Sequence, residues 1–164
     1  MRKPRILKNN AKYHVVSKIN RNESIFDNNE MKSLFMETIK RCKKKYKFSI
    51  INFVIMQNHF HFIIHTHEKE SLSRIMQWLL AVFAKYYNKL HHFEGHLWKS
   101  RFWSKIIDNL DQLFDTDNYI NENPVKSGFV QNAAEYQYGG LFYIRKKIFD
   151  IIDTPLLKNI GDRA

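Results

Sequence analysis

The sequence has little of several residue types and patterns, and each shortage excludes a class of protein. Cys42 is the single cysteine among 164 residues, so no disulfide can form within the chain and nothing calls for an oxidising compartment. No apolar run follows the basic N-terminal residues, and none is long enough to cross a bilayer. We therefore expect a cytoplasmic protein without a secretory signal or a membrane-spanning segment.

Acidic residues are also scarce relative to basic ones. The chain has 16 Asp and Glu against 27 Lys and Arg, which gives a formal net charge of +11. Such a balance favours a polyanionic partner, because basic side chains release counterions from phosphates. Nucleic acid is the partner that this charge indicates most directly; anionic lipid, or a basic surface without a partner, is the alternative reading.

What the chain has in quantity is apolar and aromatic surface. Hydrophobic residues make up 44% of the sequence and aromatic residues 15%, which is enough for a folded core. The length suits one domain over residues 1–164, and no repeat or linker divides it. Part of the aromatic surface is also available for stacking on bases.

Apolar periodicity predicts alternating strands and helices. Strands are expected over 12–19, 48–56, 59–65 and the last part of 97–107, and helices over 31–47, 72–90 and 110–123. The third helix is expected to end at Asn123-Pro124, because a residue before proline is disfavoured in the helical region. This order predicts an α+β fold: a ferredoxin-like β-α-β-β-α-β sandwich with an antiparallel sheet and an additional C-terminal helix. Residues 1–10 are expected to form a loose basic arm, and 139–164 a tail without an assigned role.

A pair of histidines stands out in the third predicted strand. His59 and His61 are two residues apart, so a strand presents both imidazoles on one face about 7 Å apart, while Phe60 and Phe62 point the other way. Neutral imidazole is a common metal ligand, and two histidines leave coordination positions open for water or substrate. By itself the pair fits half-buried histidines with ordinary hydrogen bonds at least as well.

A tyrosine and an asparagine share one face of the third predicted helix. Tyr119 and Asn123 are four residues apart. A tyrosine hydroxyl is a poor nucleophile at its ordinary pKa near 10, but a cation that neutralises the attacked phosphate makes it useful. Asn123 can supply a third, neutral oxygen ligand, and a His-His-amide site suits Mn²⁺ or Mg²⁺. From spacing alone, ordinary packing of Tyr119 is the simpler interpretation.

Three blocks together resemble a known family. They are Val54-Ile55-Met56-Gln57-Asn58-His59-Phe60-His61-Phe62, Gly95-His96-Leu97-Trp98-Lys99-Ser100-Arg101-Phe102, and the segment from Tyr119 through Asn123-Pro124 to Val130. In order and spacing they resemble the single-tyrosine HUH transposases, that is, the REP-associated tyrosine transposases and their insertion-sequence relatives. The resemblance covers about residues 11–138.

The resemblance implies a reaction and a role for each matched residue. His59, His61 and Asn123 would bind a divalent metal ion, Mg²⁺ or Mn²⁺. Tyr119 would attack a phosphodiester in single-stranded DNA, forming a 5′-phosphotyrosine link and freeing a 3′-hydroxyl. Substrates of this family are often hairpins with single-stranded flanks, and its members include monomers and homodimers that exchange catalytic helices.

Three positions depart from the family pattern. Gln57 stands where proline usually precedes Asn-His, Asn118 where an arginine often precedes the tyrosine, and Ser127 where alanine is usual. None of these changes removes a reactive group, although Asn118 weakens the case for a phosphate contact. Two other hypotheses therefore stay open: an inactive domesticated protein that binds DNA hairpins, and a metal-dependent nuclease that uses activated water.

Basic and aromatic residues elsewhere are candidates for binding DNA. Aromatic rings that alternate with cations suit a single strand, because rings stack on bases while cations follow phosphates. Packing of the rings and solvation of the cations is the alternative interpretation. The candidate DNA-binding residues are Arg2, Lys3, Arg5, Lys43, Lys44, Trp98, Lys99, Arg101, Lys105 and Lys126.

Overall fold

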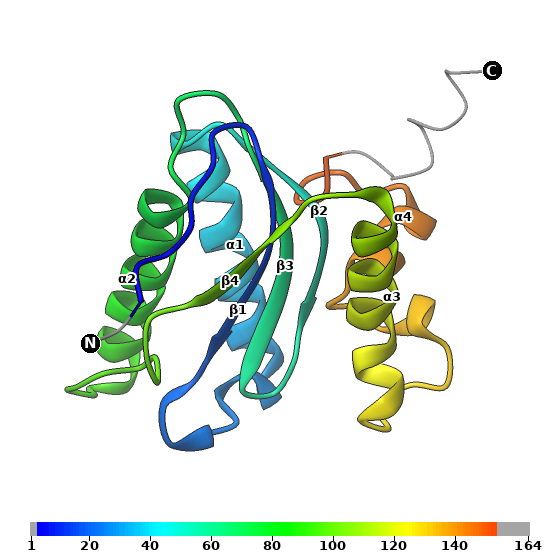
Figure 1. The fold of residues 1–164 in the computed structure, drawn as a ribbon. Helices are drawn as coiled ribbons and strands as arrows, with labels where there is room; N and C mark the ends of the chain where they lie inside the picture. The colour runs from blue at the N-terminus through cyan, green and yellow to red at the C-terminus, as the bar shows by residue number, and fades with distance from the viewer. Residues whose placement is uncertain (1–2, 154–164) are drawn as a thin grey trace.

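A four-stranded antiparallel sheet forms the centre of the protein (Figure 1). The computed structural model describes residues 3–153. The sheet has the strand order β2-β3-β1-β4, and antiparallel registers join each neighbouring pair. In chain order the elements are β1 (Lys12–Lys18), α1 (Asn29–Lys45), β2 (Phe48–Ile55), β3 (His59–Thr66), α2 (Leu72–His91), β4 (Trp103–Ile107), α3 (Leu110–Lys126) and α4 (Gly140–Lys146). This confirms the predicted ferredoxin-like sandwich with an additional helix.

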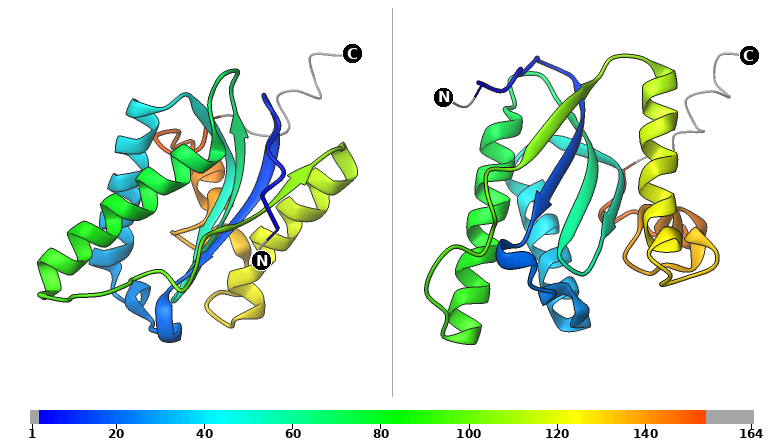
Figure 2. Two further views of the ribbon diagram at one scale, coloured as in Figure 1. Left: turned by 60° about the vertical axis from the view of Figure 1, so that its left-hand side comes forward. Right: turned by 60° about the horizontal axis from the view of Figure 1, so that its bottom comes forward.

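Helices cover both faces of the sheet. The helices α1 and α2 lie side by side on one face, and α3 lies on the other (Figures 1 and 2). The larger core fills the space under α1 and α2, where strand alternation sends Phe60 and Phe62 inward, both fully buried. None of the helices in residues 3–153 has the length and apolar character needed to cross a bilayer.

A smaller core lies between the sheet and α3. It contains Val54, Met56, Ile63, Leu113, Ile120 and Tyr136. An irregularity in β2 changes which side chains face it: Ile50 pairs with Ile64, but the next paired residue is Asn52, opposite Ile63. The extra residue shifts the alternation of β2, as β-bulges do, and the polar side chain of Asn52 is buried.

The third helix is longer than expected. Its start is as predicted, because the Asn109 side chain accepts a hydrogen bond from the Gln112 backbone N–H. Its predicted end at Asn123-Pro124 is wrong, since α3 continues through Pro124 to Lys126. Pro124 is buried one turn after Ile120 on the face toward the protein. Burial of the ring there offsets the loss of one backbone hydrogen bond.

The basic N-terminal arm is held against the protein and is not loose over the described residues from Lys3. The Tyr13 hydroxyl donates to the Lys8 carbonyl and accepts from the Lys8 N–H. The Arg5 guanidinium lies 3.5 Å from the centre of the Phe102 ring and bonds the Phe102 carbonyl. These contacts fix the arm beside β4.

Part of the predicted tail also packs on the domain. After α4, Ile151 and Ile152 are fully buried in the larger core. The Asp153 N–H donates to the Ile50 carbonyl, and the Asp153 carboxylate accepts from the Ile50 N–H at 2.8 Å. Residues 139–153 therefore complete the fold beside β2, while the rest of the tail lies outside the described residues.

Candidate active site

The two predicted metal-ligating histidines lie side by side on β3, facing α3. Their ring centres are 5.2 Å apart, with the rings nearly perpendicular. His61 is buried and His59 is partly exposed. The strand alternation expected from the sequence is confirmed, because Phe60 and Phe62 occupy the opposite core.

Tyr119 and Asn123 of α3 reach the same place. The Tyr119 ring lies 5.4 Å from that of His61, centre to centre, and about half of the tyrosine is exposed (49%). The Asn123 side chain is within hydrogen-bonding reach of His59, and its amide nitrogen donates to the Tyr119 carbonyl at 3.2 Å. All four predicted site residues therefore come together within one chain.

Beside them is an open pocket of about 560 Å³. It is lined by His14, Val16, Ser17, Lys18, His59, His61, Lys99, Ser100, Arg101, Trp103 and Tyr119. Histidines, a half-exposed phenol and several cations thus surround one space. A phosphodiester placed there would meet the tyrosine hydroxyl and positive charge at the same time.

The histidines suit a metal ion chemically. Burial lowers the pKa of His61 to about 3, and burial followed by the positive charge of Lys18 lowers the pKa of His59. Both rings are therefore neutral at pH 7, which is the state that coordinates metals. Within residues 3–153, no three His, Cys, Asp or Glu side chains are placed to hold a metal together. The donor set that fits is the mixed one predicted: two imidazoles and the Asn123 amide oxygen.

A third histidine, missed in the sequence, also belongs to the site. His14 Nε2 lies 2.9 Å from His61 Nδ1, and the two rings stack with centres 5.2 Å apart. The ring of Trp103 packs edge-on against His14 at 5.3 Å. The sequence did indicate its orientation, because the apolar residues Tyr13 and Val15 alternate with His14 and place it on the other face of β1. Only the pairing of β1 with β3 brings His14 to His61.

A buried polar cluster fastens α3 to the sheet. The amide nitrogen of Asn52 donates to Asp117 at 2.7 Å and to the Asn121 oxygen at 2.9 Å. The Asn121 amide nitrogen in turn lies 3.3 Å from the second Asp117 oxygen. Burial raises the pKa of Asp117, and these hydrogen bonds oppose the rise. Sequence reasoning missed this cluster, which lies on the turns of α3 that carry Tyr119.

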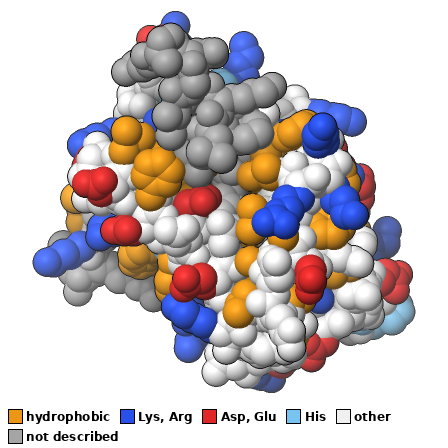
Figure 3. Space-filling view, turned by 90° about the vertical axis from the view of Figure 1, so that its right-hand side faces the viewer, with side chains coloured by type: hydrophobic (Ala, Val, Ile, Leu, Met, Phe, Trp, Pro, Cys, Tyr) orange, Lys and Arg blue, Asp and Glu red, His pale blue; other side chains and the backbone are white. Residues whose placement is uncertain are grey.

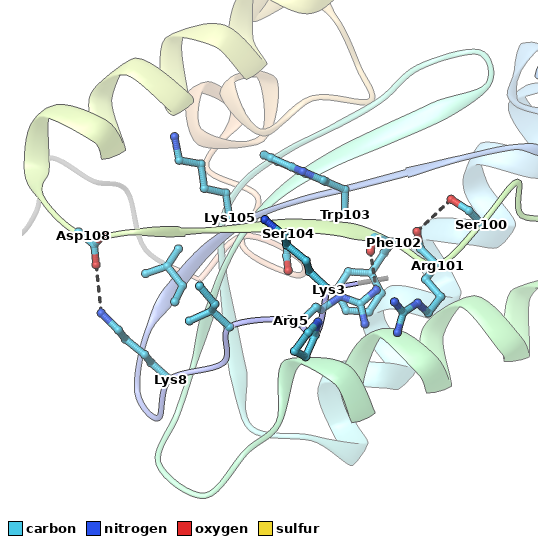
Figure 4. A pocket seen from close by; sticks show the side chains of 13 residues that line it. Lys3, Arg5, Lys8, Ser100, Arg101, Phe102, Trp103, Ser104, Lys105 and Asp108 are labelled. Atoms are coloured by element: carbon cyan, nitrogen blue, oxygen red, sulfur yellow. Dashed lines mark hydrogen bonds and ion pairs between the residues drawn. The ribbon is translucent and has the colours of Figure 1, made fainter. Parts of the chain in front are cut away.

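Many of the predicted DNA-binding residues gather beside β4. A pocket of about 840 Å³ is lined by Lys3, Pro4, Arg5, Ile6, Lys8, Ser100, Arg101, Phe102, Trp103, Ser104, Lys105, Ile106 and Asp108. Asp108 is the one acidic side chain among them, and it pairs with Lys8 at 3.4 Å. In Figure 4, Trp103 and Lys105 point to the opposite side of β4 from Arg5 and Phe102. Trp103 and Arg101 line both this pocket and the one beside the histidines.

Other predicted DNA-binding residues lie elsewhere. Lys43 and Lys44 are on α1, on the opposite face of the sheet from Tyr119, and the Lys43 ammonium bonds Asp153 and the Ile151 carbonyl. Lys126, at the end of α3, pairs with Glu122 at 2.9 Å. The face that carries α3 and α4 shows acidic and basic side chains interspersed (Figure 3). Arg2 lies outside the described residues.

Trp98 packs into the larger core. Its indole N–H donates to the Leu80 carbonyl at 2.9 Å, and its ring contacts those of Phe35, Phe60 and Phe83. Trp103, by contrast, is 51% exposed. Of the two tryptophans, Trp103 is therefore the one with a ring free to stack on a base.

Comparison with known proteins identifies the family of this chain. The profile of the family described as "Transposase IS200 like" matches residues 7–123, which include every residue of the histidine and tyrosine cluster. The chain belongs to the IS200-like transposase family. It is 26% identical over 147 residues to a Haemophilus influenzae protein provisionally named a REP-associated tyrosine transposase, covering 82% of this chain and 81% of that protein.

A solved structure supports the fold of this family member. The structure of a REP-associated tyrosine transposase bound to a REP hairpin superposes with a TM-score of 0.77, covering 94% of this chain and 91% of that one. The two sequences are 18% identical, so this likeness concerns the fold. It confirms the predicted α+β architecture, while the family profile over residues 7–123 confirms the recognition of the family.

Proposed function

We propose that this transposase cleaves and rejoins single-stranded DNA with Tyr119 as nucleophile and a divalent metal ion, Mg²⁺ or Mn²⁺, held by His59, His61 and Asn123. One observation carries the proposal: the phenol of Tyr119 lies against His61 in the chain that also supplies His59 and Asn123. Two neutral histidines and an amide converge beside the half-exposed Tyr119, and ordinary packing of the tyrosine does not account for that arrangement.

The chemistry follows from the positions of these groups. The bound metal ion would neutralise negative charge on the attacked phosphate. Tyr119 Oη forms a bond to phosphorus as its proton leaves, the bond to the 3′ oxygen breaks, and that oxygen takes a proton to become a 3′-hydroxyl. The product is a 5′-phosphotyrosine. Attack by a 3′-hydroxyl on that link reverses these steps, joins a strand and frees the tyrosine.

The flanking single strand would pass from the histidine pocket toward the N-terminal arm. Trp103 stands between the two pockets with an exposed ring, and Arg101 lines both. Beyond it, Lys3 and Arg5 add positive charge with little acid nearby. Burial, followed by the positive charge of Arg101, lowers the pKa of Arg5. Stacking on Trp103 combined with phosphate contacts suits a single strand.

Hairpin recognition and quaternary state are part of the proposal. The relative of similar fold is described as bound to a REP hairpin, and we propose a hairpin-containing substrate here too. The described site draws every residue from one chain, so a monomer already contains the nucleophile and the ligands. A homodimer that exchanges α3 would assemble the same residues from two chains.

Covalent capture tests this function. Purified protein is incubated with Mn²⁺ and single-stranded oligonucleotides from the genomic flanks of its gene, then separated under denaturing conditions. We expect a protein–DNA adduct that chelator, His59→Ala and Tyr119→Phe each abolish. Tyr136→Phe is the matched control, because its hydroxyl bonds the Ile55 carbonyl away from the histidine pair, and it should keep the adduct.

The alternatives give different results. A nuclease that uses activated water would cut DNA without an adduct and would keep cutting after Tyr119→Phe. A domesticated binding protein would retain hairpins in a gel-shift assay and show neither cleavage nor adduct. An adduct that persists in Tyr119→Phe would refute our choice of nucleophile.

A further inference from the structure

The hydrogen bond between His14 and His61 constrains how His61 can act. Only one proton can lie between His14 Nε2 and His61 Nδ1, which are 2.9 Å apart. If His61 donates, its Nδ1 carries the proton and its Nε2 keeps a free lone pair. If His14 donates, the His61 proton is on Nε2, and that nitrogen cannot bind a metal ion.

The neighbouring histidine has an equivalent arrangement with a different partner. His59 Nδ1 lies 2.8 Å from the Asn58 side-chain oxygen. Because that oxygen only accepts, His59 must donate from Nδ1 and present Nε2 with a free lone pair. Residues that hold the second nitrogen of a ligating histidine in this way fix its tautomer and ring orientation.

The surroundings of His14 allow little movement. Its ring is stacked on His61, and the rings of Trp103 and Tyr119 approach it edge-on at 5.3 and 6.1 Å. It lies on β1, and Lys105 is its register partner on β4. When His61 donates, His14 is not itself a ligand, because its Nε2 accepts that hydrogen bond and its Nδ1 carries its own proton.

We propose that His14 is a positioning residue: it accepts the Nδ1 proton of His61 and so holds His61 with Nε2 free to bind the metal ion. The inference rests on the proposed function for the identity of the ligand. It goes beyond it by assigning a role to a residue of β1 that is not itself one of the proposed metal ligands.

The tautomer can be measured without metal or activity. In the metal-free full-length protein, nitrogen-15 NMR of the histidine side chains distinguishes a ring protonated at Nδ1 from one protonated at Nε2. We expect His61 to carry its proton on Nδ1 in the wild type and in His14→Gln, whose side-chain oxygen can accept the same bond. In His14→Phe, which keeps a ring but has no acceptor, His61 should lose this preference.

Metal affinity supplies the second measurement. Titration with Mn²⁺ alone should show a 10- to 100-fold weaker affinity in His14→Phe, an order of magnitude typical of losing such a partner, and recovery toward wild type in His14→Gln. His65→Phe is the matched control: it removes a histidine of the same sheet that bonds Asn10 at the surface. It should leave Mn²⁺ affinity unchanged.

The outcomes separate this inference from the proposed function. Wild-type Mn²⁺ affinity in folded His14→Phe, or a wild-type His61 protonated at Nε2, would overturn the role of His14 even if adducts form normally. A wild type that binds no Mn²⁺ and forms no adduct would instead overturn the proposed function, whatever the tautomer of His61. The wild-type spectrum decides the tautomer even if both substitutions prevent folding.

Discussion

On one face of the sheet, Phe60 and Phe62 are fully buried beneath α1 and α2; on the other, His59 and His61 meet α3 across an open pocket. The same strand supplies both pairs by simple alternation. The first face has a large apolar core, whereas the second has a small apolar cluster and a polar one. The comparison indicates that stability is concentrated on the first face, so the second can keep polar groups and open space for chemistry.

The largest effect should come from the first face. Phe62→Ala removes a fully buried ring and should lower the free energy of unfolding by about 3–5 kcal/mol. His61→Ala, one residue earlier on the other face, should cost only about 1 kcal/mol but abolish the DNA adduct. Urea unfolding monitored by circular dichroism measures the two losses of stability, and the covalent-capture assay measures the adduct. Equal losses in the free energy of unfolding from the two substitutions would contradict the inference that stability is concentrated on the first face.

The second largest loss of stability should come from a substitution in the polar cluster under α3. Asn52→Ala leaves the partly buried Asp117 carboxylate without its main donor, which should cost about 2–3 kcal/mol. Hydrogen exchange should accelerate in α3 more than in α1. Adding Asp117→Ala to Asn52→Ala should cost less than the sum of the two single changes, because the pair acts as a unit. Additive losses would show that the cluster does not fasten α3.

The contact between α4 and Asn52 should have the third largest effect. A Cβ added at Gly140 would lie 2.1 Å from the Asn52 side-chain oxygen and 2.6 Å from Ile152 Cδ1. Because Asn52 is already bonded to Asp117 and Asn121, Gly140→Ala should destabilise the protein by about 1–3 kcal/mol. Gly139→Ala is the matched control, since its nearest atoms would be 3.5 Å away. Equal melting temperatures for the two variants would refute the close approach of Gly140 to Asn52.

Both faces of β3 and the shared face of α3 could be predicted from the sequence. The alternation of Phe60 and His61, and the shared helical face of Tyr119 and Asn123, depend on positions a few residues apart, so local periodicity was sufficient. The family resemblance then supplied the link between β3 and α3, which no local pattern contains. The order of the elements along the chain predicted the fold, and the observed strand order confirmed it.

The features that the sequence did not predict depend on long-range packing. His14 reaches His61 only through the register of β1 with β3, and Asn52 faces Asp117 only because of the irregularity in β2. The end of α3 was mispredicted because burial of Pro124 overrides a local preference. Trp98 and Trp103 look equivalent in a basic-aromatic segment, and only the fold sends one into the core and leaves the other exposed.

The last expected effect is a dependence of stability on pH that arises from the histidine face. Burial lowers the pKa of His14 to about 4 and of His61 to about 3, against about 6.5 for an unfolded histidine. Between pH 5 and 6.5 the unfolded chain therefore binds more protons than the folded one. Acidification through this window should lower the free energy of unfolding, by at most about 1.4 kcal/mol per pH unit for each histidine.

This pH effect can be assigned to the site by substitution. Asp117 acts in the opposite sense, because its raised pKa favours the folded state on acidification, but this contribution is common to the wild type and the histidine variants. Urea unfolding at pH 7, 6 and 5 should show a steady loss in the wild type and a shallower loss in His14→Gln, which has one such histidine fewer. His92→Gln, an exposed change beyond α2, should keep the wild-type slope. Stability that rises on acidification, or a slope unchanged by His14→Gln, would show that the buried histidines do not carry the dependence.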